Sequence, residues 1–316
     1  MYRFYLVLMM AIDIKSKIYQ ARCIGNVEPV EYMIPYPSMR SLIEGQNIKY
    51  ADQVIIKELN ITNQIFYDYV QQTSHWLDSL GLKPKQRIII PKLEYPQSEI
   101  FLFGVWNLGA VGVLAVDADT NKIKRVCNTK LELDSKTSLF EKIKSYPINY
   151  KPKYKPLLND EAIITFESEF GIRLSHYNLL VNTNGIQKAI ELKSRTSLHC
   201  DLKPQSTAWV IFQAILPIYS GCIFDRAKPD ITFGNSEHRY NLRKDIEKSS
   251  EFSKSDIGIC PENTAAICIG NAPIHLTSFS TDKTQVRIKG HSVMMGYLDE
   301  LKNQSSFKKE GLFISI

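Results

Sequence analysis

The sequence lacks the features that would define several function classes on their own. Its six cysteines, at positions 23, 127, 200, 222, 260 and 268, form no C-x-x-C pair, and no histidine stands at ligand spacing from one of them. A zinc site is therefore not expected. Scattered single cysteines in a chain of this length are typical of a reducing compartment, which we predict to be the cytoplasm or an organelle stroma. No internal repeat is present.

The sequence also lacks an apolar run long enough to cross a bilayer, which takes about 20 residues. The run at the N-terminus, Phe4 to Ile12, has nine residues, and Asp13 and Lys15 follow it without a small-residue cleavage site. We interpret this run as a first core strand. The alternative is a targeting or membrane-surface segment, and stable membrane insertion is not expected.

Basic residues exceed acidic ones, but no nucleic-acid-binding motif accompanies them. The 39 Lys and Arg residues against 33 acids give a net charge of +6, and 44% of the 316 residues are apolar. Part of the excess lies in residues 136–155, where six lysines stand against Glu141 alone. Prolines at 147, 152 and 156 favour a solvated, partly polyproline connector there, with a phosphate-binding patch as the alternative. A nucleic-acid partner is not expected.

The order of apolar segments predicts an α/β protein with helix-covered, mainly parallel sheets. Residues 51–59 favour a strand, Thr62 favours a helix N-cap, and Gly81 favours the end of that helix. A strand at 87–91, a helix at 98–108 and a strand at 110–116 follow, then a strand at 162–166 and a helix at 177–191. This alternation is typical of parallel sheet. After residue 256 the pattern changes to short strands, at 264–269, 275–279 and 285–289.

These segments suggest a division of the chain into four parts. We predict a first α/β lobe at 1–135, a Lys/Pro-rich connector at 136–159, a second α/β lobe at 160–255, and a small β-rich closing portion at 256–316.

Several short stretches carry recognisable chemistry, and they occur in a fixed order. The first two are Trp76-Leu-Asp-Ser-Leu-Gly-Leu-Lys-Pro-Lys-Gln-Arg-Ile-Ile-Ile and Trp106-Asn-Leu-Gly-Ala-Val-Gly-Val-Leu. Then come Leu174-Ser-His-Tyr-Asn-Leu, Leu216-Pro-Ile-Tyr-Ser-Gly, Phe233-Gly-Asn-Ser-Glu and Asp256-Ile-Gly-Ile-Cys-Pro. The last long one is Val286-Arg-Ile-Lys-Gly-His-Ser-Val-Met-Met-Gly-Tyr-Leu. From about residue 40 to residue 316, this series resembles the N-terminal domain of the adenylate-forming (AMP-binding) acyl-CoA synthetases, the acid–thiol ligase family.

The resemblance implies a phosphate loop before Leu174. The family has a Ser/Thr/Gly-rich loop there, T-S-G-T-T-G-x-P-K-G, whereas this chain has Glu167 and Glu169 and lacks the Pro-Lys-Gly segment. Ser168 and Gly171 keep family-like residues, and Arg173 could partly replace the missing lysine. The resemblance implies that these three residues bind nucleotide. For His176 we expect a structural role at a helix start.

The other motifs supply the remaining candidate residues. The stretch Phe233-Gly-Asn-Ser-Glu resembles the family's Y-G-x-T-E, which implies nucleotide binding by Phe233, Gly234 and Ser236 and a Mg²⁺ ligand in Glu237. The stretch ending at Gly221 resembles L-P-x-F-H-x-x-G without the histidine. It implies an acyl pocket lined by Tyr219 and Gly221, and a buried turn without a ligand is the alternative.

The end of the sequence, Phe307-Lys-Lys-Glu-Gly-Leu-Phe-Ile-Ser-Ile, resembles the family's F-x-x-G-W-F-x-T-G-D, cut one residue before the aspartate. The resemblance therefore implies a truncated member in which the mobile C-terminal domain and its catalytic lysine are absent, so no catalytic residue is assigned. A separate polypeptide that supplies this domain is a possible partner.

The function implied is ATP-dependent activation of a small carboxylic acid as an acyl-adenylate, followed by transfer to a thiol. ATP or AMP, Mg²⁺ and coenzyme A as co-substrate would take part. The eroded loop implies that the activity is weak or lost. As a specific member the compact length suggests an o-succinylbenzoate–coenzyme A ligase of menaquinone or phylloquinone synthesis. The alternatives are a non-catalytic nucleotide- or acyl-binding protein on the same scaffold and an α/β protein without this chemistry.

Overall fold

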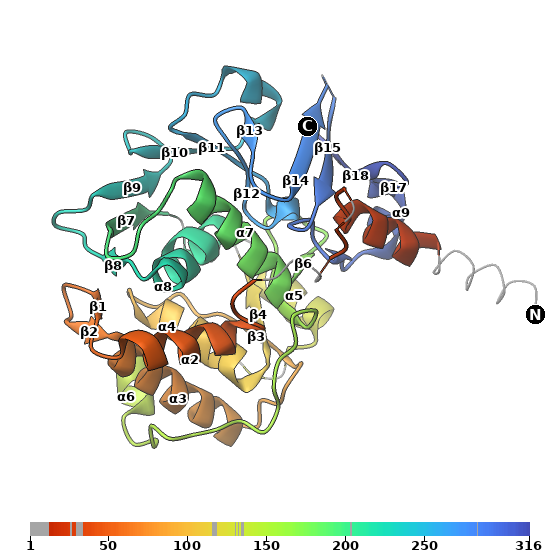
Figure 1. The fold of residues 1–316 in the computed structure, drawn as a ribbon. Coiled ribbons are helices and arrows are strands. Elements are labelled where there is room, and N and C mark those ends of the chain that lie inside the picture. The colour runs from red at the N-terminus through yellow and green to blue at the C-terminus, as the bar shows by residue number, and fades with distance from the viewer. Residues whose placement is uncertain are drawn as a thin grey trace, which may run out of the picture.

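The computed structural model describes residues 13–25, 27–29, 34–115, 119–129, 131, 133, 136–202, 204–282 and 284–316 (Figure 1). The strand predicted at Phe4 to Ile12 lies outside these residues. Within them, no helix is both long and apolar enough to cross a membrane.

The helices begin and end where local sequence signals favour it. Thr62 caps α3 by accepting a hydrogen bond from the Ile65 amide at 3.2 Å, and Gly81 follows its end with φ +90°. Residues 13–22 are also helical. The other helices are α2 (Met39–Tyr50), α3 (Asn63–Ser79), α4 (Gln97–Leu108), α5 (Thr120–Cys127), α6 (Leu139–Ile143), α7 (His176–Ala189), a π-helix (Trp209–Ile215) that continues into α8 (Leu216–Ser220), two short 3₁₀ helices (Ile246–Glu251 and Pro261–Asn263) and α9 (Glu300–Ser306).

A five-stranded sheet has the order β16-β6-β5-β4-β3. Its strands are β3 (Arg87–Ile89), β4 (Val111–Leu114), β5 (Glu161–Thr165), β6 (Ile172–Ser175) and β16 (Gly296–Tyr297). The pairs β3–β4 and β4–β5 are parallel, whereas β6 pairs antiparallel with both β5 and β16.

A nine-stranded sheet has the order β13-β12-β11-β10-β9-β7-β8-β1-β2. Its strands are β1 (Val54–Ile56), β2 (Ile61–Thr62), β7 (Ser197–Asp201), β8 (Ile223–Phe224), β9 (Ile231–Gly234), β10 (Tyr240–Arg243), β11 (Asp256–Ile259), β12 (Ala266–Ile269) and β13 (Ala272–Pro273). The six central strands from β1 to β11 pair in parallel. Antiparallel pairs occur only at the two edges of this sheet, among its described strands.

The third sheet is fully antiparallel and small. It has the order β14-β15-β18-β17, with β14 (Thr277–Thr281), β15 (Gln285–Gly290), β17 (Phe307–Lys308) and β18 (Gly311–Ser315). The predicted fold class, helix-covered mainly parallel sheet with a small β-rich C-terminal portion, is confirmed.

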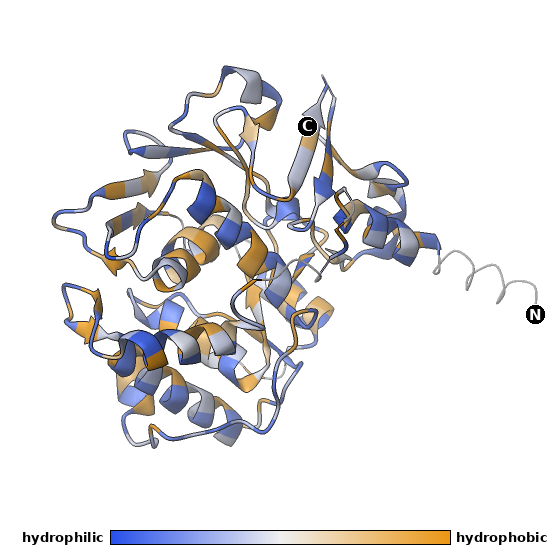
Figure 2. Cartoon of the chain, viewed as in Figure 1, coloured by the Kyte–Doolittle hydropathy of each residue, from blue (hydrophilic) through white to orange (hydrophobic). Residues whose placement is uncertain are grey.

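The sheets do not follow the predicted division into lobes. β4 and β5 lie on opposite sides of the connector predicted at 136–159, yet they pair in one sheet, and β1 pairs with β8 in the other. The connector itself contains α6, whose Leu139 and Ile143 are buried. Arg40 of α2 also donates hydrogen bonds to the carbonyls of Pro152 and Tyr154, both at 3.1 Å. The segment between α6 and β5 remains mostly hydrophilic, as expected from its lysines (Figure 2).

Helix α4 lies in the core because residues 100–106 of its sequence are apolar apart from Gly104. All twelve of its residues are buried. It packs closely on α3 because Gly104 has no side chain: a Cβ added there would lie 2.4 Å from Thr73 Cγ2. Helix α4 also packs against β4 of the five-stranded sheet, so this close contact ties α3 to that sheet through α4.

Candidate functional site

The parallel strands of the nine-stranded sheet bring several loops to one edge. β7, β9, β10 and β11 run in the same direction, so the segments that follow them leave from the same side. In open α/β sheets, ligands bind in the crevice outside the carboxyl ends of the strands. The loop between β5 and β6 reaches this edge as well, since Glu167 Oε1 accepts a hydrogen bond from the Thr207 amide at 2.6 Å.

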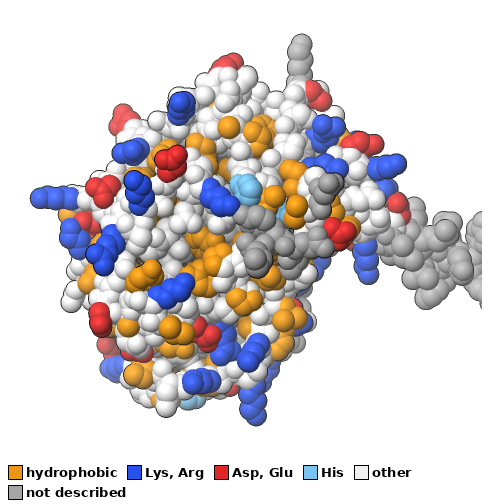
Figure 3. Space-filling view, viewed as in Figure 1, with side chains coloured by type: hydrophobic (Ala, Val, Ile, Leu, Met, Phe, Trp, Pro, Cys, Tyr) orange, Lys and Arg blue, Asp and Glu red, His pale blue; other side chains and the backbone are white. Residues whose placement is uncertain are grey.

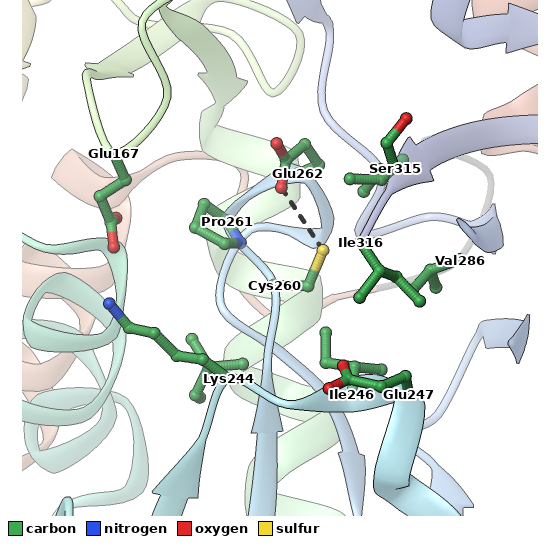
Figure 4. A pocket seen from close by; sticks show the side chains of 12 residues that line it. Glu167, Lys244, Ile246, Glu247, Cys260, Pro261, Glu262, Val286, Ser315 and Ile316 are labelled. Carbon is green, nitrogen blue, oxygen red and sulfur yellow. Dashed lines mark hydrogen bonds between the residues drawn. The ribbon is translucent and has the colours of Figure 1, made fainter. Parts of the chain in front are cut away.

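A cleft of about 230 Å³ lies at this edge (Figure 4). Residues from the β5–β6 loop, from the segments after β10 and β11, and from β15 and β18 line it. They are Glu167, Lys244, Ile246, Glu247, Ile259, Cys260, Pro261, Glu262, Val286, Ile314, Ser315 and Ile316. Figure 4 shows the Glu167 carboxylate and the Lys244 ammonium pointing toward each other across the cleft. Carboxyl groups outnumber cationic groups among these residues. The site therefore disfavours binding of a ligand with several negative charges.

Glu262 forms the inner wall of the cleft. It is buried, its Oε1 accepts a hydrogen bond from the Tyr297 hydroxyl at 3.2 Å, and its Oε2 accepts one from the Cys260 thiol at 3.5 Å. Burial raises the pKa of Glu262 and raises that of Cys260 well above its ordinary value. The Cys260 thiol is consequently protonated at neutral pH and a poor nucleophile.

The residues predicted in the phosphate loop form a tight turn. Ser168 is half-buried, its Oγ accepts from the Phe170 amide at 3.3 Å, and its carbonyl accepts from the Gly171 amide at 3.3 Å. Gly171 has φ +65°, and a Cβ added there would lie 2.7 Å from Leu298 Cδ1. A glycine is thus required at 171 by backbone conformation and packing, irrespective of any ligand.

Arg173 is held away from this turn. Its Nε lies 2.5 Å from Glu161 Oε1, and Glu161 also pairs with Arg87 at 3.0 Å. Glu161 is the first residue of β5, at the opposite end of that strand from Glu167. The guanidinium therefore contributes to an ion-pair network between strands β3, β5 and β6, at a distance from the place where a phosphate-loop lysine would act.

Phe233 and Gly234 end β9, as the motif predicts, but both are buried. The Phe233 ring has no exposed surface and packs between Phe212 and Tyr240, with ring centroids 5.0 and 5.5 Å away. Phe233 therefore has no exposed ring face, whereas Tyr240, which stacks on it, is half-buried. A Cβ at Gly234 would lie 2.2 Å from the His238 ring, which explains the glycine by close packing.

Ser236 and Glu237 lie exposed in the loop between β9 and β10, and Glu237 has φ +60°. Within the described residues, no group of three or more His, Cys, Asp or Glu side chains is arranged to hold a metal ion. A single exposed carboxylate still fits Mg²⁺, which is usually held by one or two carboxylates while phosphate oxygens and water complete its octahedron. Whether Ser236 lies beside Ser168 around one phosphate stays a prediction.

Tyr219 and Gly221 do not form the turn that the motif suggested. Residues 209–220 are continuously helical, and Gly221, with φ +63°, ends the helix. Tyr219 is buried, and its hydroxyl accepts a hydrogen bond from Asn184 Nδ2 at 2.9 Å. Neither residue lines the cleft at Cys260. The resemblance over Leu216 to Gly221 thus falls on the end of a buried helix, and an acyl pocket there stays a prediction.

Sequence reasoning missed Lys244 and Glu262 as candidate cleft residues. Lys244 follows β10 in a stretch without any motif. Glu262 lies just after Asp256-Ile-Gly-Ile-Cys-Pro, and that stretch is the signal that could have pointed to it. On the face drawn in Figure 3, Lys and Arg side chains are interspersed with acidic ones and form no continuous basic stripe.

No protein-family model matches the sequence, and no curated protein sequence matches it. Solved structures do match. An anthranilate CoA ligase, AuaEII, in complex with anthranoyl-AMP superposes with a TM-score of 0.71 at 15% identity, covering 90% of this chain and 74% of that one. The inhibitor-bound N-terminal domain of FACL13 from Mycobacterium tuberculosis has a TM-score of 0.67 at 12% identity, covering 88% and 95%.

MatB from Rhodopseudomonas palustris is similar in the same way, with a TM-score of 0.69 at 14% identity and coverage of 88% of this chain and 75% of that one. At such low identity the likeness establishes the fold alone. The chain has the fold of the N-terminal domains of adenylate-forming ligases.

Proposed function

We propose that the chain binds an adenylate at the edge of the nine-stranded sheet and activates a small carboxylic acid there as its acyl-adenylate. The observation that carries this proposal is the cleft at Cys260, which the β5–β6 loop and the carboxyl ends of β10 and β11 enclose on this fold. Superposed structures with anthranoyl-AMP and phenylalanyl-adenylate support an adenylate as the ligand. The acceptor thiol of the proposed reaction is coenzyme A.

The proposal gives a part to five of the predicted residues, none of which is among the lining residues of the cleft at Cys260. Ser168 and Ser236 donate hydrogen bonds to the α-phosphate, and the face of Tyr240 replaces Phe233 beside adenine. Glu237 supplies one oxygen ligand to Mg²⁺, which would neutralise phosphate charge when bound. Tyr219 and Gly221 act by supporting the helix that ends beside α2 and α7. A domain carrying a catalytic lysine, in the same polypeptide or in another, would complete the reaction centre.

The charge around the cleft favours a nucleotide with few negative charges. The acidic residues in its lining are Glu167, Glu247 and Glu262. Lys244 is the basic residue among the described lining residues. A carboxylate at contact distance from a phosphate costs about 1 kcal/mol even in water. AMP and acyl-adenylates carry one phosphate, whereas ATP carries three. The carboxylates therefore repel AMP and acyl-adenylates less than ATP.

We therefore expect the full chain to bind AMP at least tenfold more tightly than ATP, with little or no pyrophosphate exchange. Calorimetric titration of both nucleotides with Mg²⁺ measures the preference. Glu167→Gln keeps an acceptor for the Thr207 amide and should reduce the preference for AMP over ATP about fivefold. Glu251→Gln, at an exposed position, should leave this preference unchanged. Glu237→Ala should weaken Mg²⁺-dependent binding of both nucleotides.

Pyrophosphate exchange with a panel of acids that includes anthranilate and o-succinylbenzoate identifies the acid. Tighter binding of ATP than of AMP, together with robust exchange, would contradict our interpretation of the acidic loop. The alternative function, a non-catalytic adenylate-binding protein, is favoured by the Arg173–Glu161 ion pair, since it leaves the β5–β6 loop without that cation. AMP binding without exchange for any acid or added polypeptide would support it.

A further inference from the structure

A second cleft, of about 470 Å³, lies where β7 and β8 end against the start of α4. Apolar side chains form one part of its lining and polar or charged side chains the other. It is lined by Leu93, Tyr95, Ser98, Glu99, His199, Cys200, Asp201, Leu202, Pro204, Trp209, Gln213 and Arg226. None of these residues belongs to the cleft at Cys260, and we call this one the Glu99 cleft.

The carboxyl group of Glu99 is buried in the wall of this cleft and only half satisfied. Its Oε1 accepts hydrogen bonds from Trp209 Nε1 at 2.9 Å and from Gln213 Nε2 at 2.6 Å. Its Oε2 is buried and has no hydrogen-bond partner among the residues that the structure describes. A carboxyl oxygen left bare in this way costs free energy unless something else supplies a donor.

A second buried polar atom in the wall also lacks a hydrogen-bond partner among the described residues. His199 Nδ1 has no hydrogen-bond partner within the described part of the chain, and burial lowers the pKa of this histidine, which keeps the ring neutral. The wall beside Glu99 thus contains two buried polar atoms without a hydrogen-bond partner among the described residues, one from α4 and one from β7.

The charge on Glu99 is not balanced inside the wall. Trp209 and Gln213 are neutral donors, and Arg226 stands at the exposed mouth, 5.0 Å above the Tyr95 ring. Burial raises the pKa of Glu99 to about 7, so near neutral pH the carboxylate form becomes available to a cation. A ligand ammonium group supplies both the missing charge and up to three N–H donors, whereas a hydroxyl group supplies one donor and no charge.

We propose that the Glu99 cleft binds a small organic molecule that carries a protonated amine on an apolar body, with the ammonium group donating to Glu99 Oε2. The apolar body lies against Trp209, Tyr95 and Leu93. This site does not depend on the nucleotide function proposed above, because the two clefts share no residue and the test below contains no nucleotide.

The test uses the full chain and three probes of one shape: 4-fluorobenzylamine, 4-fluorobenzyl alcohol and 4-fluorobenzoate, titrated at pH 7.5 and followed by ¹⁹F NMR. We expect the amine to bind at least tenfold more tightly than the alcohol or the benzoate. Glu99→Gln keeps an acceptor for Trp209 and Gln213 but removes the charge, and it should reduce the preference for the amine to twofold or less. The same change at an exposed position, Glu251→Gln, should leave the preference intact.

A second measurement uses the unchanged protein, so it does not depend on correct folding of the Glu99→Gln variant. The indole N–H of Trp209 donates to Glu99, so its ¹H–¹⁵N resonance, assigned with Trp209→Phe, should shift on titration with the amine and not with the alcohol. Equal affinity of the three probes, or an indole resonance that the amine leaves unchanged, would overturn the proposal.

Discussion

Two fully buried ionisable side chains have pKa values shifted in opposite directions by the same cause. Burial lowers the pKa of His176 from 6.5 to about 4 and raises that of Glu99 from 4.5 to about 7, since it disfavours the charged form of each. The His176 ring accepts a hydrogen bond from the Met39 amide through Nδ1 at 3.4 Å, which requires that nitrogen to be unprotonated. The structural role expected for His176 at a helix start is thereby confirmed.

The two residues should give the free energy of unfolding opposite slopes with pH. Between pH 4 and 6.5 the unfolded chain protonates His176 and the folded chain does not, so this residue makes stability rise with pH. Between pH 4.5 and 7 the folded chain keeps Glu99 protonated, so that residue makes stability fall with pH. A shift of about 2.5 pH units corresponds to about 3 kcal/mol in each case.

We therefore expect His176→Asn to remove a rise of about 3 kcal/mol, and Glu99→Gln to remove a fall of similar size. Urea denaturation at half-unit steps from pH 4 to 7.5 measures both differences from the unchanged protein. Parallel stability curves for the unchanged protein and either variant would show that the residue does not titrate as its burial implies.

At the level of residues, the motifs predicted positions better than roles. Phe233 and Gly234 end a strand as expected. The Phe233 ring is nevertheless buried, and a side chain at Gly234 would clash with His238. The Glu99 cleft could not have been predicted, because Glu99 lies about 100 residues before His199 and Trp209 along the chain. Their proximity follows from sheet order, which local patterns do not encode.

Elements with strong local signals were predicted well. Thr62, Gly81 and the apolar run from Ser98 to Leu108 mark helices whose bounds the structure gives within a residue or two. Ser175 caps α7 and forms a capping box with Asn178. This cap explains why a serine and an asparagine stand in the stretch from Leu174 to Leu179. Helix α6 was missed, because five residues among lysines and prolines carry little periodicity.

The crossing of α3 and α4 makes a prediction at this scale. Gly104→Ala places a methyl group 2.4 Å from Thr73 Cγ2 and should lower the free energy of unfolding by about 1–3 kcal/mol, despite the higher helix propensity of alanine. Thr73→Ser removes that methyl group and keeps the hydroxyl bond to the Tyr69 carbonyl. The double variant should recover only part of the loss in thermal or urea unfolding, because Thr73 Cβ, which serine keeps, would still lie 2.7 Å from the added methyl group. Additive losses in the two changes would contradict a direct contact.

At the scale of the molecule, the fold class was predictable and the sheet order was not. Alternating apolar segments predict parallel sheet wherever they occur, but they do not tell which strand pairs with which. The pairing of β4 with β5 and of β1 with β8 joins segments that the lysine-rich stretch had suggested were separate. Side-chain packing across long sequence separations decides such pairs.

The cysteines test the integrity of the whole fold. Cys23 is half-buried, whereas Cys127, Cys200, Cys222, Cys260 and Cys268 are buried. In the folded protein we expect at most one thiol to react rapidly with an aromatic disulfide reagent, and the other five to react at the rate of opening or global unfolding. Counting labelled thiols by intact mass over time measures this. Rapid labelling of three or more would show that the core is more open than the structure indicates.

The short strand β16 determines when the five-stranded sheet can be completed during synthesis. Gly296 and Tyr297 pair with Arg173 and Ile172 on β6, which leaves the ribosome much earlier. Until residues near 297 emerge, that edge of β6 exposes unpaired N–H and C=O groups, which can pair with other chains. A nascent chain that stalls before Gly296 is therefore exposed to misassembly, and chaperone contact should concentrate on this strand late in translation.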